Sequence, residues 1–339
     1  MTADRKISRR QALGMSAAFG AGLAAPALLP RAALAQESAD AYPSRDIKIF
    51  CAFPAGSGAD VLARFYAEGM KPAFPNRSIL IENRPGANGN IATIATARSK
   101  PDGYTLYIHG ISGLAANMHL YKDPGVDAGK TIEVLATVSK LTFTVSVRAN
   151  APWKNLKELI AYIREKGDKA SYATTAPTGK VPGAMMKVNL GLKALEVPYR
   201  TGPDSLNDLA SGNIDYAMYD PTFALAQERA GRIRILAVAS GERMQCMPDV
   251  PTMKEEGAGD INVLGWWGLM APRGVPDPIK KKLGDAFYAM ARAPATKEFL
   301  VKAGTDPFIL SPEEAQRYFL EEIENWRRYV KIANIEPMG

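Results

Sequence analysis

The sequence has very few of the residues on which most catalytic and metal centres depend. Its 339 residues include only two histidines and two cysteines. His109 and His119 have no cysteine or acidic partner at metal-ligand spacing, so we expect no metal site and no cofactor. Neither a G-x-S-x-G nucleophile motif nor a P-loop occurs in the chain. These absences favour a binding protein over an enzyme.

Two cysteines are also too few for a disulfide framework. Cys51 falls in an expected core strand and Cys246 in an expected loop. We therefore expect two free thiols, one of them buried, with a single bridge as the alternative.

Long apolar runs are absent except near the amino terminus. Residues 1–35 have a basic start, a small and apolar run at 12–29, and an A-x-A site at 33–35 before Gln36. We interpret them as a signal peptide that is cleaved near Ala35-Gln36, which predicts a soluble protein in the periplasm. The sequence SRRQAL at 8–13 resembles a twin-arginine signal, with the general secretion route as the alternative. Glycine and proline interrupt the apolar run, which argues against a buried helix or a membrane anchor.

The excess of positive charge is partly a property of this segment. The whole chain has a formal charge of +7, and residues 1–35 hold five basic residues and one acid, so the mature chain carries +3. That value is poor support for nucleic-acid binding, and we expect no nucleic-acid partner.

The remaining chain, about 304 residues, alternates between strand and helix patterns and is long enough for two domains. Strands are expected at 47–53, 78–82, 104–108, 132–138, 143–148, 171–173, 197–199, 214–219, 233–239 and 263–269. Helices are expected at 60–70, 91–98, 156–166, from 184 onward, 204–210, 278–292, 295–303 and 312–331. This alternation predicts an α/β fold with largely parallel sheets, whose ligands lie at the carboxyl ends of the strands.

The corner between the first strand and the first helix is the first candidate site. Gly56, Ser57 and Gly58 lack bulky side chains, so a ligand can come close to the backbone, and the unpaired N–H groups of the helix can hold a carboxylate or phosphate. A purely structural turn is the alternative. Asp60 is a candidate catalytic acid, but an acid at a helix start is more often a cap or a dipole partner. Val61 stands where a dinucleotide fingerprint needs its third glycine.

A second corner follows the strand at 171–173. We expect a loop from Thr174 to Gly183, which places hydroxyl groups and open N–H groups before a helix near Ala184. Lys180 adds a positive charge there. The alternative is a surface loop whose lysine faces water.

Eight short motifs, in order along the mature chain, resemble the Bug family, the substrate-binding proteins of tripartite tricarboxylate transporters. The motifs are FPAGSGAD at 53–60, ENRPGANGNI at 82–91, PDGYTL at 101–106, VPYR at 197–200, LAVA at 236–239, PDVPT at 248–252, WGLMAP at 267–272 and ANI at 333–335. Each motif alone is weak, but their ordered series is specific and spans essentially the whole mature chain.

The resemblance implies a type II periplasmic-binding-protein fold, in which two α/β domains joined by crossing strands close on a ligand. Residues 36–142 and 265–339 would form domain 1, residues 143–264 domain 2, with crossings at 143–147 and 263–271. The implied protein is a monomeric receptor for a small organic acid, which serves a permease of one large and one small subunit, or a sensor kinase. The implied ligand-binding residues are Phe53, Pro54, Ala55, Gly56, Ser57, Gly58, Asp60, Asn88, Thr174, Thr175, Pro177, Thr178, Gly179, Lys180, Tyr199, Tyr219 and Asp220.

In this family the ligand carboxylate often meets the backbone of the first corner through ordered water, which suits a chain without an arginine clamp. The chain departs from the family pattern at Ala59, at Ala176 and Pro177, at Pro182 and at Tyr219. Lys180, Tyr199 and Tyr219 would suit an anionic ligand with a flat or aromatic body. Two alternatives stay open here: an exported enzyme of organic acids with Asp60 or Asp220 as base, and a scaffold with an empty cleft.

Overall fold

The structure is a computed structural model, and it describes residues 40–339. The predicted signal peptide, residues 1–35, lies outside the described residues. Within residues 40–339, no helix is both long enough and apolar enough to cross a membrane. Cys51 and Cys246 are both free thiols, the first buried and the second half-buried, as the sequence predicts.

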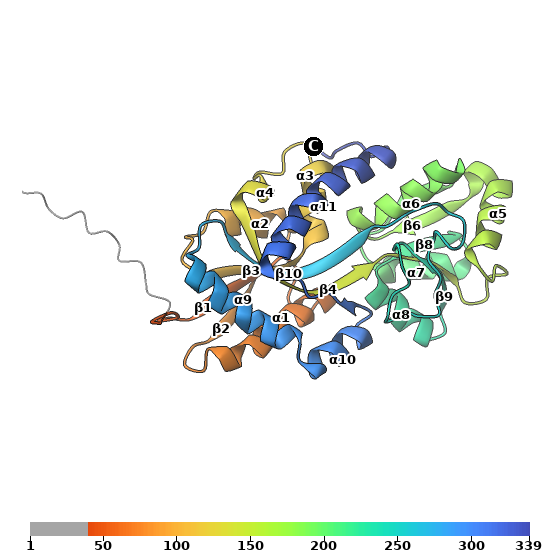
Figure 1. Cartoon of the computed structure of the whole chain (residues 1–339). Helices are drawn as coiled ribbons and strands as arrows, with labels where there is room; N and C mark the ends of the chain where they lie inside the picture. Colours follow the sequence, from red (N-terminus) through yellow and green to blue (C-terminus); the bar gives the residue numbers. More distant parts are fainter. Residues whose placement is uncertain (1–39) are drawn as a thin grey trace, which may run out of the picture. The chain divides into compact units, whose positions relative to one another are not determined.

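The described residues form two β-sheets (Figure 1). The first sheet has six strands in the order β11-β4-β10-β3-β1-β2, namely β1 (Ile47–Cys51), β2 (Ile79–Asn83), β3 (Thr105–Gly110), β4 (Ile132–Thr142), β10 (Leu264–Pro272) and β11 (Asp306–Pro307). The second sheet has five strands in the order β7-β6-β8-β5-β9, namely β5 (Thr144–Arg148), β6 (Ser171–Thr174), β7 (Leu195–Pro198), β8 (Tyr216–Tyr219) and β9 (Ile233–Val238).

Helices cover both sheets (Figure 1). Those that follow first-sheet strands are α1 (Gly58–Met70), α2 (Asn90–Ala97), α3 (Ile111–Leu120), α4 (Ala128–Thr131), α9 (Asp277–Ala291), α10 (Pro294–Lys302) and α11 (Pro312–Ile332). Those that follow second-sheet strands are α5 (Leu156–Lys166), α6 (Pro177–Leu190), α7 (Gly202–Ser211) and α8 (Pro221–Arg229). The sequence patterns missed α3, α4 and α8.

The prediction of largely parallel sheets is wrong, because both sheets are mixed. In the first sheet β1 runs parallel to β2 and β3, but β10 runs antiparallel to β3 and β4. In the second sheet β6 is parallel to β7 and β8, but β5 is antiparallel to β8 and β9. The strands that connect the sheets cause the difference. Only strands linked through crossover helices stay parallel.

The chain passes between the sheets at two adjacent points. Phe143 is the single residue between β4 of the first sheet and β5 of the second. Its carbonyl oxygen accepts a hydrogen bond of 2.9 Å from the N–H of Ala239, which follows β9. The Thr142 hydroxyl donates to the carbonyl of Val263, directly before β10, at 3.1 Å. Residues 40–339 belong to one compact unit, and the division into 36–142 plus 265–339 and 143–264 stays a prediction.

The apolar core runs through both sheets. One buried cluster packs β1, β3 and β4 of the first sheet against α1 and α9. A second cluster lies within the second sheet beside α7 and α8. The largest cluster joins the two sheets, because it contains residues of α3 and α11 together with Tyr172 of β6 and Val181 of α6. The first and second sheets are therefore held together by buried side chains as well as by the crossing strands.

Helix α6 begins seven residues earlier than the sequence predicts. It starts at Pro177, where the missing N–H and the fixed φ of proline are tolerated, and it contains Pro182. Two glycines and this internal proline lower its intrinsic helix propensity, and the segment therefore looked like a loop. Tertiary packing overrides that preference: Val181 and Met186 are fully buried in the cluster that joins the sheets.

Candidate functional site

The first corner, residues 53–57 between β1 and α1, is folded tightly by its own backbone and Ser57. Strand β1 ends at Cys51, two residues before the predicted end. The Ser57 hydroxyl donates to the carbonyl of Pro54 at 2.8 Å and accepts from the N–H of Asp60 at 3.2 Å, so Ser57 is the N-cap of α1. Gly56 has a φ of 79°, which favours glycine.

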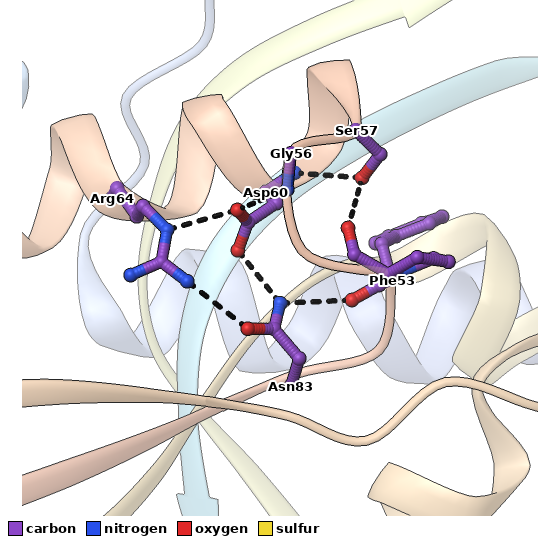
Figure 2. A network of polar contacts seen from close by, with 7 residues as sticks. Phe53, Gly56, Ser57, Asp60, Arg64 and Asn83 are labelled. Atoms are coloured by element: carbon purple, nitrogen blue, oxygen red, sulfur yellow. Dashed lines mark hydrogen bonds and ion pairs between the residues drawn. The ribbon is translucent and has the colours of Figure 1, made fainter.

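The carboxylate of Asp60 holds this corner together through a network of hydrogen bonds, called the brace below (Figure 2). One carboxylate oxygen accepts from the N–H of Gly56 and from Nε of Arg64, each at 2.9 Å. The other accepts from Nδ2 of Asn83 at 2.7 Å, and the same Nδ2 lies 2.9 Å from the carbonyl oxygen of Phe53. Arg64 completes the ring with a bond of 3.0 Å to Asn83 Oδ1. These hydrogen bonds tie the first corner to β2, through Asn83, and to α1, through Asp60 and Arg64.

The brace decides the charge of Asp60. Burial raises the pKa of this carboxyl, but the hydrogen bonds from Arg64, Asn83 and Gly56 outweigh burial and leave the pKa below its usual value. Asp60 is only 2% exposed. This buried, ionised carboxylate accepts hydrogen bonds on both oxygens and so holds the corner together. Direct contact of its carboxylate with a ligand stays a prediction.

A second turn of the first sheet, residues 86–89, leads into α2. Gly86, Ala87, Asn88 and Gly89 all have positive φ values, between 45° and 126°. The exposed Asn88 donates to the Tyr121 hydroxyl at 2.6 Å, and its carbonyl accepts from Asn117 at 2.9 Å. Asn88 is thus held in place, and its predicted contact with a ligand is untested.

The second corner is held by an acid that the sequence did not single out. Glu196 of β7 accepts a hydrogen bond of 2.9 Å from the hydroxyl of Thr174 on one oxygen and pairs with Lys180 at 3.0 Å on the other. Because α6 begins at Pro177, Thr178, Gly179 and Lys180 lie in its first turn, whereas we had predicted them in a loop. The expected positive charge of this corner is therefore balanced by Glu196.

The other predicted residues of the second sheet have their polar atoms engaged by the protein. The Tyr199 hydroxyl donates to Asp208 at 2.6 Å, and the fully buried Tyr219 shares a hydrogen bond of 2.8 Å with Ser205. Asp220 caps α8 by accepting from the N–H of Phe223 at 3.0 Å. Contact with a ligand through these three side chains stays a prediction.

Both corners border the crossing between the sheets. The ring of Phe53 lies 5.7 Å from that of Trp267 on β10. A Cβ atom on Gly179 would come within 2.7 Å of the ring of Phe143, between β4 and β5. Thr175 is half-buried nearby on the second-sheet side. The two corners are thus each packed against one of the connecting segments.

Two hollows lie elsewhere, on either side of Pro312 between α9 and α11, with volumes of about 490 and 590 Å³. None of the predicted site residues lines them. Residues 40–339 also contain no group of three or more His, Cys, Asp or Glu side chains that could hold a metal ion.

Sequence reasoning considered His109 only as a metal ligand and missed its position. His109 follows Ile108 near the carboxyl end of β3, and its ring packs 5.1 Å from Phe53 of the first corner and 6.3 Å from Trp267. Burial lowers its pKa to about 3, so the imidazole is neutral. A polar residue at the end of a buried strand was the signal available in the sequence.

Comparisons with known proteins show which family the chain resembles and which solved structures share its fold. The model of the tripartite tricarboxylate transporter family receptor matches residues 62–335. The solved structure of the periplasmic binding protein BugD is 31% identical, covers 88% of this chain and 100% of its own, and superposes with a TM-score of 0.74. Rpa4515 of R. palustris, solved with adipate, is 29% identical over 88% and 100% of the two chains, with a TM-score of 0.78. MatC of Rhodopseudomonas palustris, solved with bound malate, is 26% identical over 85% and 100%, with a TM-score of 0.72. These likenesses confirm the predicted two-lobed fold.

Proposed function

Because the chain belongs to the family of tripartite tricarboxylate transporter receptors, which are periplasmic solute-binding proteins and not enzymes, we propose that it captures a small organic acid between its two sheets and delivers it to a membrane permease. Membership of this family also places the protein outside the cytoplasm. The proposed route there is the signal peptide at residues 1–35, cleaved near Ala35-Gln36.

The observation that carries the proposal is the pair of related structures with bound acids. Rpa4515 holds adipate and MatC holds malate, and both match this chain over at least 85% of its length. Adipate and malate each carry two carboxylates on a short chain. We therefore expect a ligand with a carboxylate at one end and a second polar group at the other.

The first corner suits the carboxylate end. The 13-residue helix α1 begins there, and the first N–H groups of a helix have no partner within it. Arg64 pairs with Asp60, so the negative charge of that carboxylate is balanced and does not repel a second anion. Pro54 has no N–H, and the N–H groups of Gly56 and Ser57 bond to Asp60 and to the carbonyl of Pro54. In this proposal the ligand therefore meets the backbone of residues 54–58 through the remaining N–H groups, in part through ordered water.

The second corner suits the other end. Thr175 and Thr178 are half-buried, and Lys180 keeps 40% of its side chain exposed although it pairs with Glu196. A ligand oxygen that approaches α6 would compete with Glu196 for the ammonium group. The proposed second-sheet contacts are thus with side chains, and they can differ between family members more readily than backbone contacts can.

Calorimetric titration of the mature protein tests the proposal. Adipate, malate, citrate, benzoate and glutamate are titrated separately, and thermal unfolding is followed with each at saturation. At least one acid should bind and raise the unfolding temperature, since a ligand that binds only the folded state stabilises it. Recovery of every acid unchanged after long incubation is expected. Failure of every carboxylate in the panel to bind would refute the proposal, and turnover of a bound acid would favour an enzyme.

A matched pair of variants tests the role of α6. Lys180→Ala should weaken binding of the acid about tenfold, as expected for loss of one charge-assisted hydrogen bond. Lys187→Ala, on the same helix but in its last turn, is the control and should leave affinity unchanged. Equal affinities for the two variants would remove Lys180 from the site.

A further inference from the structure

His109 is a buried histidine without a hydrogen-bond partner. Its side chain is 4% exposed, and among the described residues neither Nδ1 nor Nε2 has a partner. His119, the other histidine, has its Nε2 only 2.8 Å from the carbonyl oxygen of Ile323. A neutral imidazole has one donor and one acceptor, and leaving a buried polar group unpaired costs about 1–3 kcal/mol. Such a group in a native protein calls for an explanation.

The imidazole lies where two helices begin. A Cβ atom on Gly89, the N-cap of α2, would come within 2.6 Å of Nε2, and a Cβ on Gly113, in the first turn of α3, within 2.2 Å. Both helices lack a side-chain N-cap hydrogen bond. Nε2 is therefore aimed at the amino ends of α2 and α3, and it fits there because both neighbours are glycines. These ends carry partial positive charge and attract anions.

One aromatic neighbour of the ring is less buried than the others. Tyr107 stacks on the imidazole at 5.2 Å and is fully buried, and Trp267 is 5% exposed. Phe53, the first residue of the first corner, is the aromatic neighbour that is half-exposed. A rotamer change of this one phenylalanine would be the simplest way to uncover the ring.

We propose that His109 is a specificity-determining residue of the organic-acid site: when the carboxylate end of an acid occupies the first corner, beside the amino ends of α2 and α3, Phe53 moves off the imidazole and the ring N–H donates a hydrogen bond to a carboxylate or hydroxyl oxygen of the ligand. This inference rests on the proposed function. It assigns a neutral, side-chain donor to an end of the ligand that is otherwise held by backbone.

Nitrogen NMR of the untagged mature protein tests the inference directly, because the chain has only two histidines. Imidazole ¹⁵N shifts report the tautomer and the hydrogen bonds of each ring. Saturation with adipate or malate, whichever binds more tightly, should shift a nitrogen of His109 and leave those of His119 unchanged. The emission of Trp267, identified by comparison with Trp267→Phe, should change in the same titration because Phe53 packs on both rings. A bound acid with unchanged His109 nitrogens would overturn the inference and leave the proposed function intact.

Variants of the two histidines provide a second test of the inference. His109→Leu should weaken binding about tenfold, and His109→Gln, which keeps a donor, should bind within about threefold of the wild type. His119→Gln is the control and should bind like the wild type. Equal affinity of the Leu and Gln variants would contradict the inference, and an absence of carboxylate binding by the wild-type protein would refute both this inference and the proposed function. If the Leu variant does not fold, the NMR experiment on the wild type still decides.

Discussion

The two corners solve the same problem in different ways. The first is locked by protein groups alone: Asp60 accepts three hydrogen bonds from Gly56, Arg64 and Asn83 and is itself almost fully buried. The second depends on one half-exposed ion pair between Lys180 and Glu196, on a helix that contains two glycines and a proline. The comparison teaches that, in the proposed site, the first corner is the more rigid end and the second the more adjustable one.

Among the changes that test this comparison, removal of the Asp60 carboxylate should have the largest effect on stability. Asp60→Ala removes the acceptor of the Gly56 N–H and one of the two acceptors of Arg64 and of the Asn83 amide, which should lower the free energy of unfolding by about 3 kcal/mol. Chemical denaturation measures the loss. Asp204→Ala is a matched control, because Asp204 also stands three residues after its N-cap, Thr201, but is exposed. A loss for Asp60→Ala no greater than that of the control would mean that the first corner is not locked by this carboxylate.

Glycine-to-alanine substitutions should have the second largest effect, and they should differ between the two corners. Gly179→Ala places a methyl group within 2.7 Å of the buried Phe143 ring, and this overpacking should lower the free energy of unfolding by about 1–3 kcal/mol. The higher helix propensity of alanine should offset about 1 kcal/mol of that loss. Gly56→Ala meets no atom within 4 Å, so its cost of about 1 kcal/mol comes only from the positive φ. Thermal unfolding of both variants gives the comparison. A stabilised Gly179→Ala would show that Phe143 can move aside.

Acid should lower the free energy of unfolding of the protein through His109. Burial alone holds the folded pKa at about 3, against 6.5 for an unperturbed histidine, so the unfolded chain takes up a proton that the folded chain refuses. As the pH falls below 6.5, this residue should cost about 1.4 kcal/mol of stability for each pH unit, and above 6.5 it should cost nothing. Unfolding curves between pH 7 and 5 for wild type and His109→Gln measure the difference. Parallel pH profiles of the two proteins would contradict the buried neutral state.

The smallest expected effect concerns the adjustable corner. Glu196→Gln frees Lys180 from its partner, so a bound carboxylate should gain about threefold in affinity because it no longer competes with an acid. Stability should change by less than about 1 kcal/mol, since Lys180 is well exposed to solvent. Calorimetry with the best-bound acid measures the gain, and Glu165→Gln on α5 is the control. A weaker affinity for Glu196→Gln would instead make Glu196 part of the binding surface.

Regular elements were predictable where the local signals agreed. Helix α5 has an Asn155 cap, an apolar stripe and Gly167 at its end, and its predicted bounds match the structure. Helix α6 was predicted to begin seven residues late, because its proline and glycines signal a loop and only burial against the other sheet makes it helical. Strand direction was predicted wrongly because alternation in sequence does not reveal that a strand returns from another sheet.

For the candidate site too, some features could be predicted from the sequence and others could not. The ordered motifs identified the family, and the family comparison confirms both that resemblance and the expectation of a solute-binding protein. Partners that lie far away in sequence escaped notice, as Asn83 did for Asp60 and Glu196 did for Lys180. No local pattern tells which acid will meet which base across neighbouring strands. His109 was missed because a histidine inside a strand has the same local appearance whether its ring is paired or not.

The path of the chain between the sheets has a practical result for engineering. The segment that builds the second sheet departs at Phe143 and returns at Val263, and hydrogen bonds join the strands on either side of this gateway. Its two ends are neighbours, so exchanging the segment with that of a relative needs only two splice points. Such a hybrid would also have to repack the buried cluster that joins the two sheets.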